Sequence, residues 1–509
     1  MSPPRLPRPS RSLWLPDRST TYPPLAGDER ADVVVVGAGI AGLTTAVLLA
    51  RAGRTVRVLE AGLLGDGTTG HTTAKISALQ GTRYRTITDT HGPDAARRYA
   101  EAQLAGLAWV ARFVSENEVD CAFERRPALT YATSVEGRAT VQSEADAASA
   151  AGLAVEVVDD AGLPFATTGA VVLADQAQFD PHPYLLALAA EVDATAGCHV
   201  HERSRVLRLH DDRWRRVSTD AGSVRADHVV VTTLLPITDQ GLLFARTEPK
   251  RSYCIAVTLE NDPPTGMYLS ADTPSRSLRS ATHEGSEVLV VGGGGHVTGR
   301  RSPTSAIYQE LADWAAGHFG VRDIVTRWSA QDYESVDHLP VVGPARPGIA
   351  HPLVATGFAK WGMTNGTAAA QALADRVLDH GDGPSARWRD LFDPGRISVR
   401  ATVGAARLNA GVAAHLAGGW LSPRAGPETG EVSARRSRRG LRPVGTADVD
   451  GDQVSVSLIC THLGGICTWN DAERTWDCPL HGSRFSAGGT VVNAPATRPL
   501  DRQAPVRAT

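Results

Sequence analysis

The stretch Asp32–Glu60, DVVVVGAGIAGLTTAVLLARAGRTVRVLE, decides how the first part of this chain folds. Its run of valines is typical of a buried β-strand, which we expect over Ala31–Gly37. A glycine-rich turn leads into an apolar helix over Ile40–Ala52, and a second strand follows over Thr55–Glu60. A strand, a tight turn, a helix and another strand in this order predict the start of a parallel βαβ unit, and therefore an α/β fold.

The turn matches the G-x-G-x-x-G pattern of dinucleotide-binding folds. Gly37 permits the tight turn, Gly39 lets a pyrophosphate approach the backbone, and Gly42 lets the helix and the strand pack closely. The helix N-terminus offers N–H donors and its positive dipole end to the phosphates. Glu60, at the end of the second strand, can accept hydrogen bonds from both ribose hydroxyls. The pattern therefore predicts a bound dinucleotide rather than an unliganded turn, but it does not separate FAD from NAD.

Two further stretches favour FAD. The first is Gly65–Gln80, GDGTTGHTTAKISALQ, whose small and hydroxyl side chains, Thr68 and Thr69 among them, would wrap a second phosphate and reach a flavin. The second is Ala355–Ala370, ATGFAKWGMTNGTAAA, in which a turn at Gly362 precedes a helix of small residues. The N-terminus of such a helix would stabilise the negative charge of a reduced flavin. Close packing of an ordinary helix is the alternative for the second stretch.

Lysine is rare in this chain, which has only Lys75, Lys250 and Lys360 among its 52 Lys and Arg residues. Where Arg fills nearly every basic position, a remaining Lys is a candidate for chemistry that requires a compact ammonium group with a shiftable pKa. Chance survival is the alternative for each of the three.

The most specific pattern lies near the C-terminus. It consists of Cys460-Thr-His462-Leu-Gly-Gly and Cys478-Pro-Leu-His481-Gly-Ser, with 15 residues between His462 and Cys478. Two thiolates and two imidazoles on paired loops are the ligands of a Rieske 2Fe-2S centre, in which the histidines hold one of the two irons and raise the potential. A Cys2His2 zinc site is the alternative, but the usual histidine spacing of a zinc finger is absent.

The chain up to residue 395 resembles a known family. Residues 31–395 are similar to the D-amino-acid oxidase/glycine oxidase family of FAD-dependent oxidoreductases. The resemblance rests on GAGIAG with Glu60, on GTTGHTTAK, on the strand around Val206, on EPKRSYCIAV, and on DHLPVVG followed by ATGFAKWGMTNG. It implies an α/β FAD-binding domain of the glutathione-reductase (Rossmann) type. It also implies an inserted α+β substrate domain with an antiparallel sheet, built from insertions at about 115–170 and 245–330.

Site residues follow from the same resemblance. The backbone of Val206 would contact adenine, and Gly362, Met363 and Thr364 would lie at the edge of the isoalloxazine. In the dimethylglycine and sarcosine dehydrogenases of this family, a histidine in a similar G-[ST]-T-x-H stretch is attached to the flavin, and His71 matches that spacing. A histidine that only hydrogen-bonds the flavin or the substrate loop is the alternative.

The C-terminal stretch resembles the Rieske domain of flavoprotein–Rieske fusions. Such domains often read CTHLGC and CPCHGS, where the extra cysteines form a disulfide between the two loops, whereas this chain has Gly465 and Leu480 at those positions. Ser483 is retained and could donate a hydrogen bond to the cluster. Phe485 stands where high-potential Rieske proteins have a tyrosine donor. We therefore expect an intermediate or low reduction potential.

Length and composition set the remaining expectations. At roughly 150 residues per domain, 509 residues predict about three domains. We divide the chain into an irregular leader (1–30), the FAD-dependent oxidoreductase domain (31–395), a helix and linker (396–443) and a small all-β Rieske domain (444–509).

Charge and cysteine usage bear on partners and compartment. The net charge of −3 gives no reason to expect nucleic acid or membrane insertion. The start of the chain lacks the apolar run of a signal peptide. Four cysteines look like isolated thiols, as in a reducing compartment: Cys121, Cys198, Cys254 and Cys467. We therefore expect a cytoplasmic protein.

Together these patterns predict an oxidoreductase in which FAD takes electrons from a small amine or amino acid and passes them one at a time to the Rieske cluster. The candidates for catalytic residues near the flavin are His71, Lys75 and Lys360. The alternative is a flavin reductase, electron-transfer or redox-sensing module whose electrons come from NADH or a ferredoxin. Gly292–Gly295 follows a strand but lacks the helix of a second dinucleotide site, which favours the dehydrogenase. The sequence does not identify the final electron acceptor.

Overall fold

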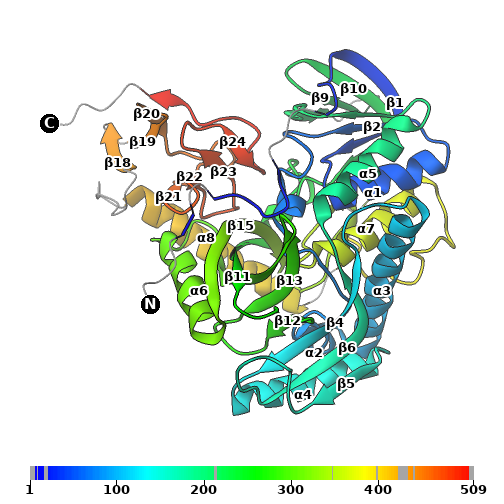
Figure 1. Cartoon of the computed structure of the whole chain (residues 1–509). Coiled ribbons are helices and arrows are strands. Elements are labelled where there is room, and N and C mark those ends of the chain that lie inside the picture. The colour runs from blue at the N-terminus through cyan, green and yellow to red at the C-terminus, as the bar shows by residue number, and fades with distance from the viewer. Residues whose placement is uncertain are drawn as a thin grey trace.

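The computed structural model describes residues 6–7, 10–16, 21–210, 215–346, 348–396, 399–421, 434–439 and 442–503. These residues form two large sheets and two small ones (Figure 1). The helices are α1 (Ile40–Arg51), α2 (Arg83–His91), α3 (Pro93–Glu116), α4 (Val135–Ala150), α5 (Pro181–Ala194), α6 (Ser305–His318), α7 (Gly362–Val377) and α8 (Val399–Leu421), with short 3-10 turns η1 (Thr68–His71) and η2 (Gln240–Ala245).

The first large sheet has the predicted βαβ unit at its centre. Its strands are β1 (Gly27–Val36), β2 (Val56–Leu59), β7 (His199–His201), β8 (Arg208–His210), β9 (Arg216–Ser218), β10 (Gly222–Val231), β16 (Val341–Arg346) and β17 (Ile349–Thr356). The run β17-β10-β1-β2-β7 is parallel, and β16 and β9 pair antiparallel with it. Helix α1 packs on β1 and β2 and is covered in turn by α5 and α7.

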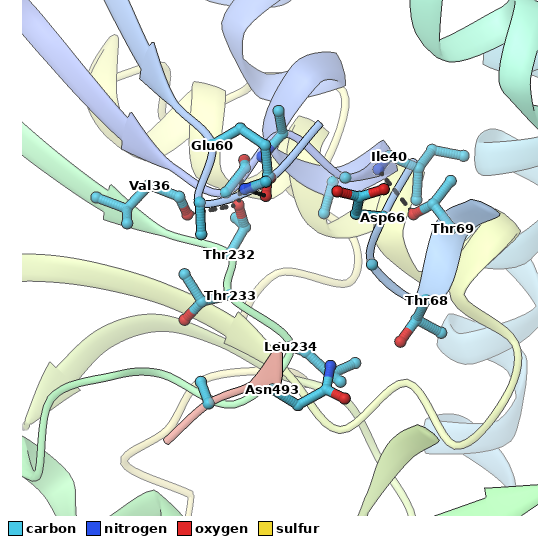
Figure 2. Close-up of a pocket in the computed structure, with 18 of the residues that line it drawn as sticks. Val36, Ile40, Glu60, Asp66, Thr68, Thr69, Thr232, Thr233, Leu234 and Asn493 are labelled. Atoms are coloured by element: carbon cyan, nitrogen blue, oxygen red, sulfur yellow. Dashed lines mark hydrogen bonds between the residues drawn. The ribbon is translucent and has the colours of Figure 1, made fainter. Parts of the chain in front are cut away.

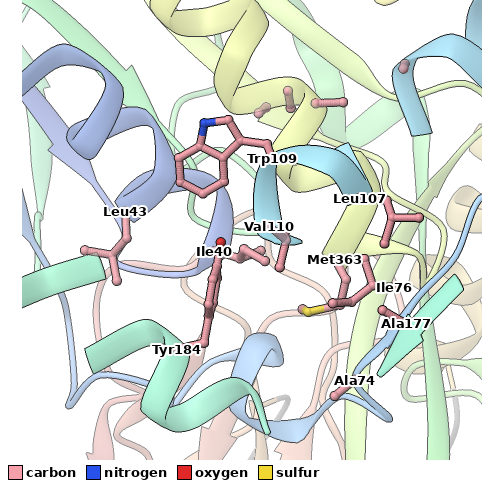
Figure 3. Packing of buried hydrophobic residues seen from close by; sticks show 14 of the residues in the cluster. Ile40, Leu43, Ala74, Ile76, Leu107, Trp109, Val110, Ala177, Tyr184 and Met363 are labelled. Carbon is pink, nitrogen blue, oxygen red and sulfur yellow. The ribbon is translucent and has the colours of Figure 1, made fainter. Parts of the chain in front are cut away.

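The valine run of β1 is buried on both faces of this sheet. Val33 and Val35 are in the core beneath α1, whereas Val34 and Val36 belong to a second core on the opposite face. This explains the absence of an alternating pattern in the sequence, because parallel sheets are covered on both sides. Figure 3 shows the larger core, in which α1, α3, α5 and α7 contribute Leu43, Trp109, Tyr184 and Met363. Among the described residues, no helix is both long enough and apolar enough to cross a membrane.

The second large sheet is mostly antiparallel and forms the predicted inserted domain. Its strands are β3 (Lys75–Ile76), β4 (Glu124–Ala132), β5 (Val155–Val158), β6 (Gly169–Gln178), β11 (Thr247–Leu259), β12 (Met267–Ser270), β13 (Ser277–His283), β14 (Ser286–Val297) and β15 (Val321–Ser335). Both expected insertions end too early. Gln178 still pairs with Glu124, and Ser335 still pairs with Thr247, so β6 and β15 extend beyond residues 170 and 330.

The C-terminal part forms two small antiparallel sheets that lie above β11 and β15 (Figure 1). Their strands are β18 (Arg435–Arg439), β19 (Arg442–Val449), β20 (Asp452–Ser457), β25 (Arg502–Gln503), and then β21 (Thr468–Asn470), β22 (Thr475–Asp477), β23 (Arg484–Ser486) and β24 (Val491–Asn493). Buried Trp469 and Trp476 lie with ring centroids 4.6 Å apart in the core between them.

Two expected boundaries differ from the structure. Strand β1 begins at Gly27, because Gly27 pairs with Gly222, so the irregular leader ends before residue 30. Strand β18 pairs with β19 from Arg435 onward, so the end of the expected linker belongs to the all-β domain. Within the expected helix and linker, residues 397–398, 422–433 and 440–441 lie outside the described residues. The helix expected in this stretch is α8.

The close approach at Gly42 gives a first testable prediction. A Cβ atom at this position would lie 2.0 Å from the carbonyl oxygen of Gly37 and 2.7 Å from Thr232 Oγ1. We expect Gly42→Ala to lower the free energy of unfolding by about 1–3 kcal/mol, because the turn must shift, and to lower the flavin content. Urea unfolding and flavin absorbance measure both. Gly317→Ala in α6 is the control, since its Cβ would meet nothing within 4 Å; equal stability of the two variants contradicts the prediction.

Candidate functional site

A cavity of about 420 Å³ opens at the carboxyl ends of the parallel strands, where the glycine turn meets α1. Figure 2 shows this cavity, with Glu60 and Thr69 on one side and Asn493 of the C-terminal domain on the other. Eight of the ten residues predicted to bind FAD line it: Gly37, Gly39, Glu60, Thr68, Thr69, Val206, Gly362 and Met363. The cavity lies where a doubly wound sheet binds a dinucleotide.

The glycine turn is held in a conformation that suits a phosphate. Gly37 has a φ of +100°, which side chains rarely adopt, and its N–H is donated to the carbonyl of Leu59. The Glu60 carboxylate accepts N–H groups from Ala38 at 2.8 Å and from Gly62 at 3.0 Å. Burial raises the pKa of Glu60, and these two donors oppose the rise. The carboxylate thus ties both sides of the turn together at the position where a ribose would lie.

Two of the predicted cofactor residues lie off the cavity wall. Gly42 packs beneath the turn, as its close contact with Gly37 requires. Thr364 is buried behind the wall, where its hydroxyl oxygen accepts a hydrogen bond from Gln80 Nε2 at 3.0 Å. Thr69 stands at the wall itself, and its Oγ1 accepts the N–H of Ile40 at 3.2 Å. Contact of Val206 with adenine and of Thr364 with the flavin edge stay predictions.

A second cavity, of about 710 Å³, adjoins the first. The two share Thr68, Thr72, Asp332 and Lys360 in their walls. All three lysines of the chain line this second cavity, as does His71. The sequence singled out the three lysines because they are rare, but it did not show that they lie around the same cavity.

The three lysines differ in their partners. Lys250 Nζ lies 3.1 Å from Glu334 Oε2, and this carboxylate also receives Arg83 at 3.1 Å. Buried Lys75 instead donates from Nζ to the carbonyl of Tyr268 at 2.6 Å and to Ser277 Oγ at 2.8 Å. Burial lowers the pKa of Lys75 to about 7, and it also lowers the pKa of Lys360.

His71 lies at the end of η1, and its Nδ1 is 2.9 Å from the carbonyl oxygen of Gly67. If Nδ1 carries the proton, Nε2 is left with a lone pair. Burial lowers the pKa of His71, which favours the neutral form of the imidazole. The ring lines the second cavity and is not part of the wall of the first. A covalent bond from His71 to the flavin stays a prediction.

Gly292–Gly295 is not a nucleotide turn. These residues lie inside β14 and form a wall of the second cavity. A Cβ atom at Gly295 would lie 2.9 Å from Lys360 Nζ, and one at Gly294 would lie 2.2 Å from Ile307. The glycines therefore provide space beside a lysine and a helix.

The two cysteine–histidine loops meet at one end of the C-terminal domain. The thiols of Cys460 and Cys478 are within hydrogen-bonding range of each other, and the rings of His462 and His481 have centroids 5.2 Å apart. His481 Nδ1 is buried with no hydrogen-bond partner among the described residues, as expected of an atom placed for a metal. Burial lowers the pKa of His481 to about 4, so the ring is neutral and able to ligate.

These four side chains fit a 2Fe-2S cluster. In the described part of the chain, no three His, Cys, Asp or Glu side chains are arranged to hold a single metal ion, whereas a Rieske cluster needs only two protein ligands on each iron. The thiol pair would hold one iron and the imidazole pair the other, so Cys460, Cys478, His462 and His481 are the residues that could hold the cluster.

The surroundings of the thiols correct one expectation. Cys467 is not isolated, because its buried thiol contacts both Cys460 and Cys478. The expected absence of a disulfide between the loops is compensated by packing: a Cβ atom at Gly465 would lie 2.6 Å from Leu480 Cδ1, so Leu480 fills that space. The Ser483 hydroxyl is in hydrogen-bonding range of Cys460, as predicted, and its oxygen accepts the N–H of Ala496 at 3.0 Å.

The histidine loops are docked against the flavin-binding part of the chain, including the wall of the second cavity. Tyr333 of β15 donates its hydroxyl to the carbonyl of His481 at 2.8 Å, and Gln331 Nε2 donates to the carbonyl of Gly482 at 2.8 Å. The ring of Phe244 contacts both imidazoles, with its centroid 4.8 Å from that of His481. His462 Nε2 lies 3.0 Å from Asp239 Oδ1. None of these docking residues carries a sequence motif, so the sequence did not identify them.

The docking extends to the first cavity. Six residues of the C-terminal domain line that cavity together with residues of the flavin domain: Val491, Val492, Asn493, Ala494, Ala496 and Thr497. Arg205, beside Val206, donates to the carbonyl of Val491 at 3.0 Å. The dinucleotide cavity is therefore walled by both domains.

A dinucleotide cavity, a second cavity beside it and a site of two thiols and two imidazoles together define an iron–sulfur flavoprotein. Comparison with known families supports this class. Residues 32–376 match the family described as FAD dependent oxidoreductase, and residues 433–504 match the Rieske [2Fe-2S] domain. The first match covers more than half of the chain, so the chain belongs to the FAD dependent oxidoreductase family, with a Rieske domain at its C-terminal end. It binds FAD and a 2Fe-2S cluster.

One curated relative spans both domains. The chain is 33% identical over 487 residues to YhfW of Bacillus subtilis (strain 168), named as a Rieske 2Fe-2S iron-sulfur protein, with 94% of each chain covered. The cluster region alone is 44% identical over 46 residues to the cytochrome b6-f complex iron-sulfur subunit of Synechococcus sp. (strain JA-3-3Ab), which is 9% of this chain and 27% of that one.

Solved structures share the fold of the flavin part. Glycine oxidase from Geobacillus kaustophilus aligns with a TM-score of 0.60 at 18% identity, covering 73% of this chain and 100% of its own. L-proline dehydrogenase from P. horikoshii aligns with a TM-score of 0.60 at 17% identity, covering 72% and 97%. At these identities the likeness concerns the fold alone.

The contact between Ser483 and Cys460 gives a second prediction. A hydroxyl donor to a ligating sulfur stabilises the reduced, more negative cluster. We expect Ser483→Ala to lower the midpoint potential by roughly 40–90 mV, the one-electron equivalent of a hydrogen bond worth about 1–2 kcal/mol. A redox titration followed by EPR measures it. Ser486→Ala is the control, because that hydroxyl accepts the N–H of Thr490 in a hairpin turn. An unchanged potential in Ser483→Ala disproves the role of the hydroxyl.

Proposed function

We propose that this protein oxidises a small amine or amino acid at the carbon next to nitrogen and passes the electrons, one at a time, to its own Rieske cluster. The docking of the His481 loop on β15 carries this proposal. When bound, FAD supplies an acceptor for two electrons, and the cluster accepts a single electron at each reduction. The protein's part is to hold the two groups next to each other and to shape the substrate cavity.

The contacts along β15 support electron transfer within the chain. Tyr333 donates to the carbonyl of the ligand His481, and Tyr333 also lines the second cavity. Two residues earlier, Gln331 holds Gly482, and the carbonyl of Gln331 accepts the hydroxyl of Thr68, which lines both cavities. Strand β15 thus connects the cluster loop to the walls of the first and second cavities through hydrogen bonds and short covalent paths.

The polarity of the second cavity supports a small charged or polar substrate. Its wall carries cations and carboxylates, among them Lys250, Lys360, Glu334 and Asp332. Burial raises the pKa of Asp332 to about 6, although the N–H of Lys360 is donated to it. A substrate with both an ammonium and a carboxylate group would find a partner for each.

Anaerobic mixing of the purified holoprotein with candidate reductants tests this function. If the proposal holds, an amine or amino acid bleaches the flavin absorbance, and the cluster then gains the EPR signal of its reduced form. Bleaching by NADH and by none of the amines would instead identify a reductase that feeds the Rieske cluster. Flavin reduction that never reaches the cluster would refute transfer within the chain.

The role of Tyr333 is tested by Tyr333→Phe, which removes the hydrogen bond to His481. We expect the rate of cluster reduction to fall several-fold relative to the rate of flavin reduction in stopped-flow measurements, because the coupling between the two sites weakens. Tyr253→Phe is the matched control: Tyr253 is equally buried on the neighbouring strand β11, and its hydroxyl has no hydrogen-bond partner among the described residues. The same ratio of rates in both variants would show that the hydroxyl of Tyr333 plays no part.

A further inference from the structure

Lys75 is held in a manner that suits a neutral amine. Its Nζ donates to two uncharged acceptors, the carbonyl of Tyr268 at 2.6 Å and Ser277 Oγ at 2.8 Å. A neutral amine has two N–H groups and one lone pair, so these two acceptors use both of its donors. Lys75 is 7% exposed and lines the second cavity. Within the described residues it forms no ion pair, unlike Lys250 with Glu334 and Glu248.

The charged and titratable neighbours of Lys75 do not favour its ammonium form. The guanidinium of Arg279 on β13 repels it, and the Cys254 thiol on β11, whose own pKa is raised to about 12, offers no nearby negative charge. Arg279 is fixed by donating Nη1 to the carbonyls of Thr73, Ala74 and Phe179. Burial is the largest cause that brings the pKa of Lys75 down to about 7.

We infer that Lys75 accepts a proton from the ammonium group of the amine substrate in the second cavity. This inference rests on the proposed function. An ammonium has no lone pair with which to form a C=N bond, so it must lose a proton before the adjacent C–H bond gives up its two electrons. In the step assigned to Lys75, one N–H bond of the substrate breaks, one N–H bond forms at Nζ, and no electrons leave either molecule. FAD is the oxidant of the later step.

The same cavity makes the transfer feasible. Its walls desolvate the substrate ammonium, and the Glu334 carboxylate is already paired with Lys250 and Arg83, so desolvation lowers the pKa of the substrate toward that of Lys75. A base whose pKa lies close to the working pH is the most effective acceptor.

The scarcity of lysine permits a direct test that needs no substrate. The oxidised holoprotein labelled with 13C at lysine Cε should give three lysine signals, of which Lys75→Met removes one and Lys250→Met another. We expect the Lys75 signal to titrate with a midpoint near 7, below that of Lys250. A midpoint above 9 for Lys75 overturns the inference.

The pH dependence of turnover provides the second test. With an amine that reduces the flavin, kcat/KM of the wild-type protein should rise with pH through about 7, where Lys75 becomes neutral. In Lys75→Met this limb should disappear, and kcat/KM should follow the neutral fraction of the free amine, whose pKa is near 10. At pH 7 the loss should be roughly 10²–10⁴-fold, and it should largely recover at high pH.

A conservative variant separates catalysis from structure. Lys75→Arg keeps the donors to Tyr268 and Ser277 but cannot lose its proton near neutrality, so a structural role predicts rescue and the proposed role predicts none. Wild-type pH profiles in both variants would overturn the inference while leaving the amine-oxidising function intact. If no amine bleaches the flavin, the function itself fails, and the inference fails with it; the titration would still report whether Lys75 is neutral.

Discussion

The hydrogen bond from Tyr333 to the carbonyl of His481 joins the two halves of this protein at their reactive ends. Tyr333 is fully buried, and Gln331 adds a second bond to Gly482 from the same strand. Each half alone is a familiar arrangement, a dinucleotide fold and a cluster-binding β-domain. What this chain adds is their fixed orientation, with both imidazoles turned toward the flavin domain and covered by Phe244. The histidine loops thus pack against the flavin domain.

The sequence predicted the structure correctly where a local pattern is compatible with only one backbone conformation. The GAGIAG turn with Glu60 predicted strand, turn and helix, because only glycine fits at Gly37 and Gly42. The spacing of Cys460, His462, Cys478 and His481 predicted paired loops. The predicted ends of the strands were less accurate. Gly27 belongs to a strand because it pairs with Gly222, which is distant in sequence, and Arg435 belongs to a strand because it pairs with Thr446 across a turn.

Properties that arise from distant contacts could not be read from the sequence. Lys75, Lys250 and Lys360 are separated by more than a hundred residues each, and only the antiparallel sheet and the turn before α7 bring them to one cavity. Tyr333 and Asp239 belong to no sequence motif. They matter because they contact His481 and His462 in the cluster loops. Cys467 looked isolated because the contact with Cys478 crosses a β-hairpin.

The packing of Leu480 against Gly465 has a consequence for how the cluster loops respond to their surroundings. None of the six cysteines forms a disulfide, and the loops are held by a leucine side chain and by backbone hydrogen bonds, such as Cys460 N–H to Gly465 and Cys478 N–H to Ser483. A dithiol reductant has no covalent crosslink to cleave in this domain. The attachment of the two cluster loops to each other therefore does not depend on a bond that a reductant could break, in contrast to domains whose loops are clamped by a cystine.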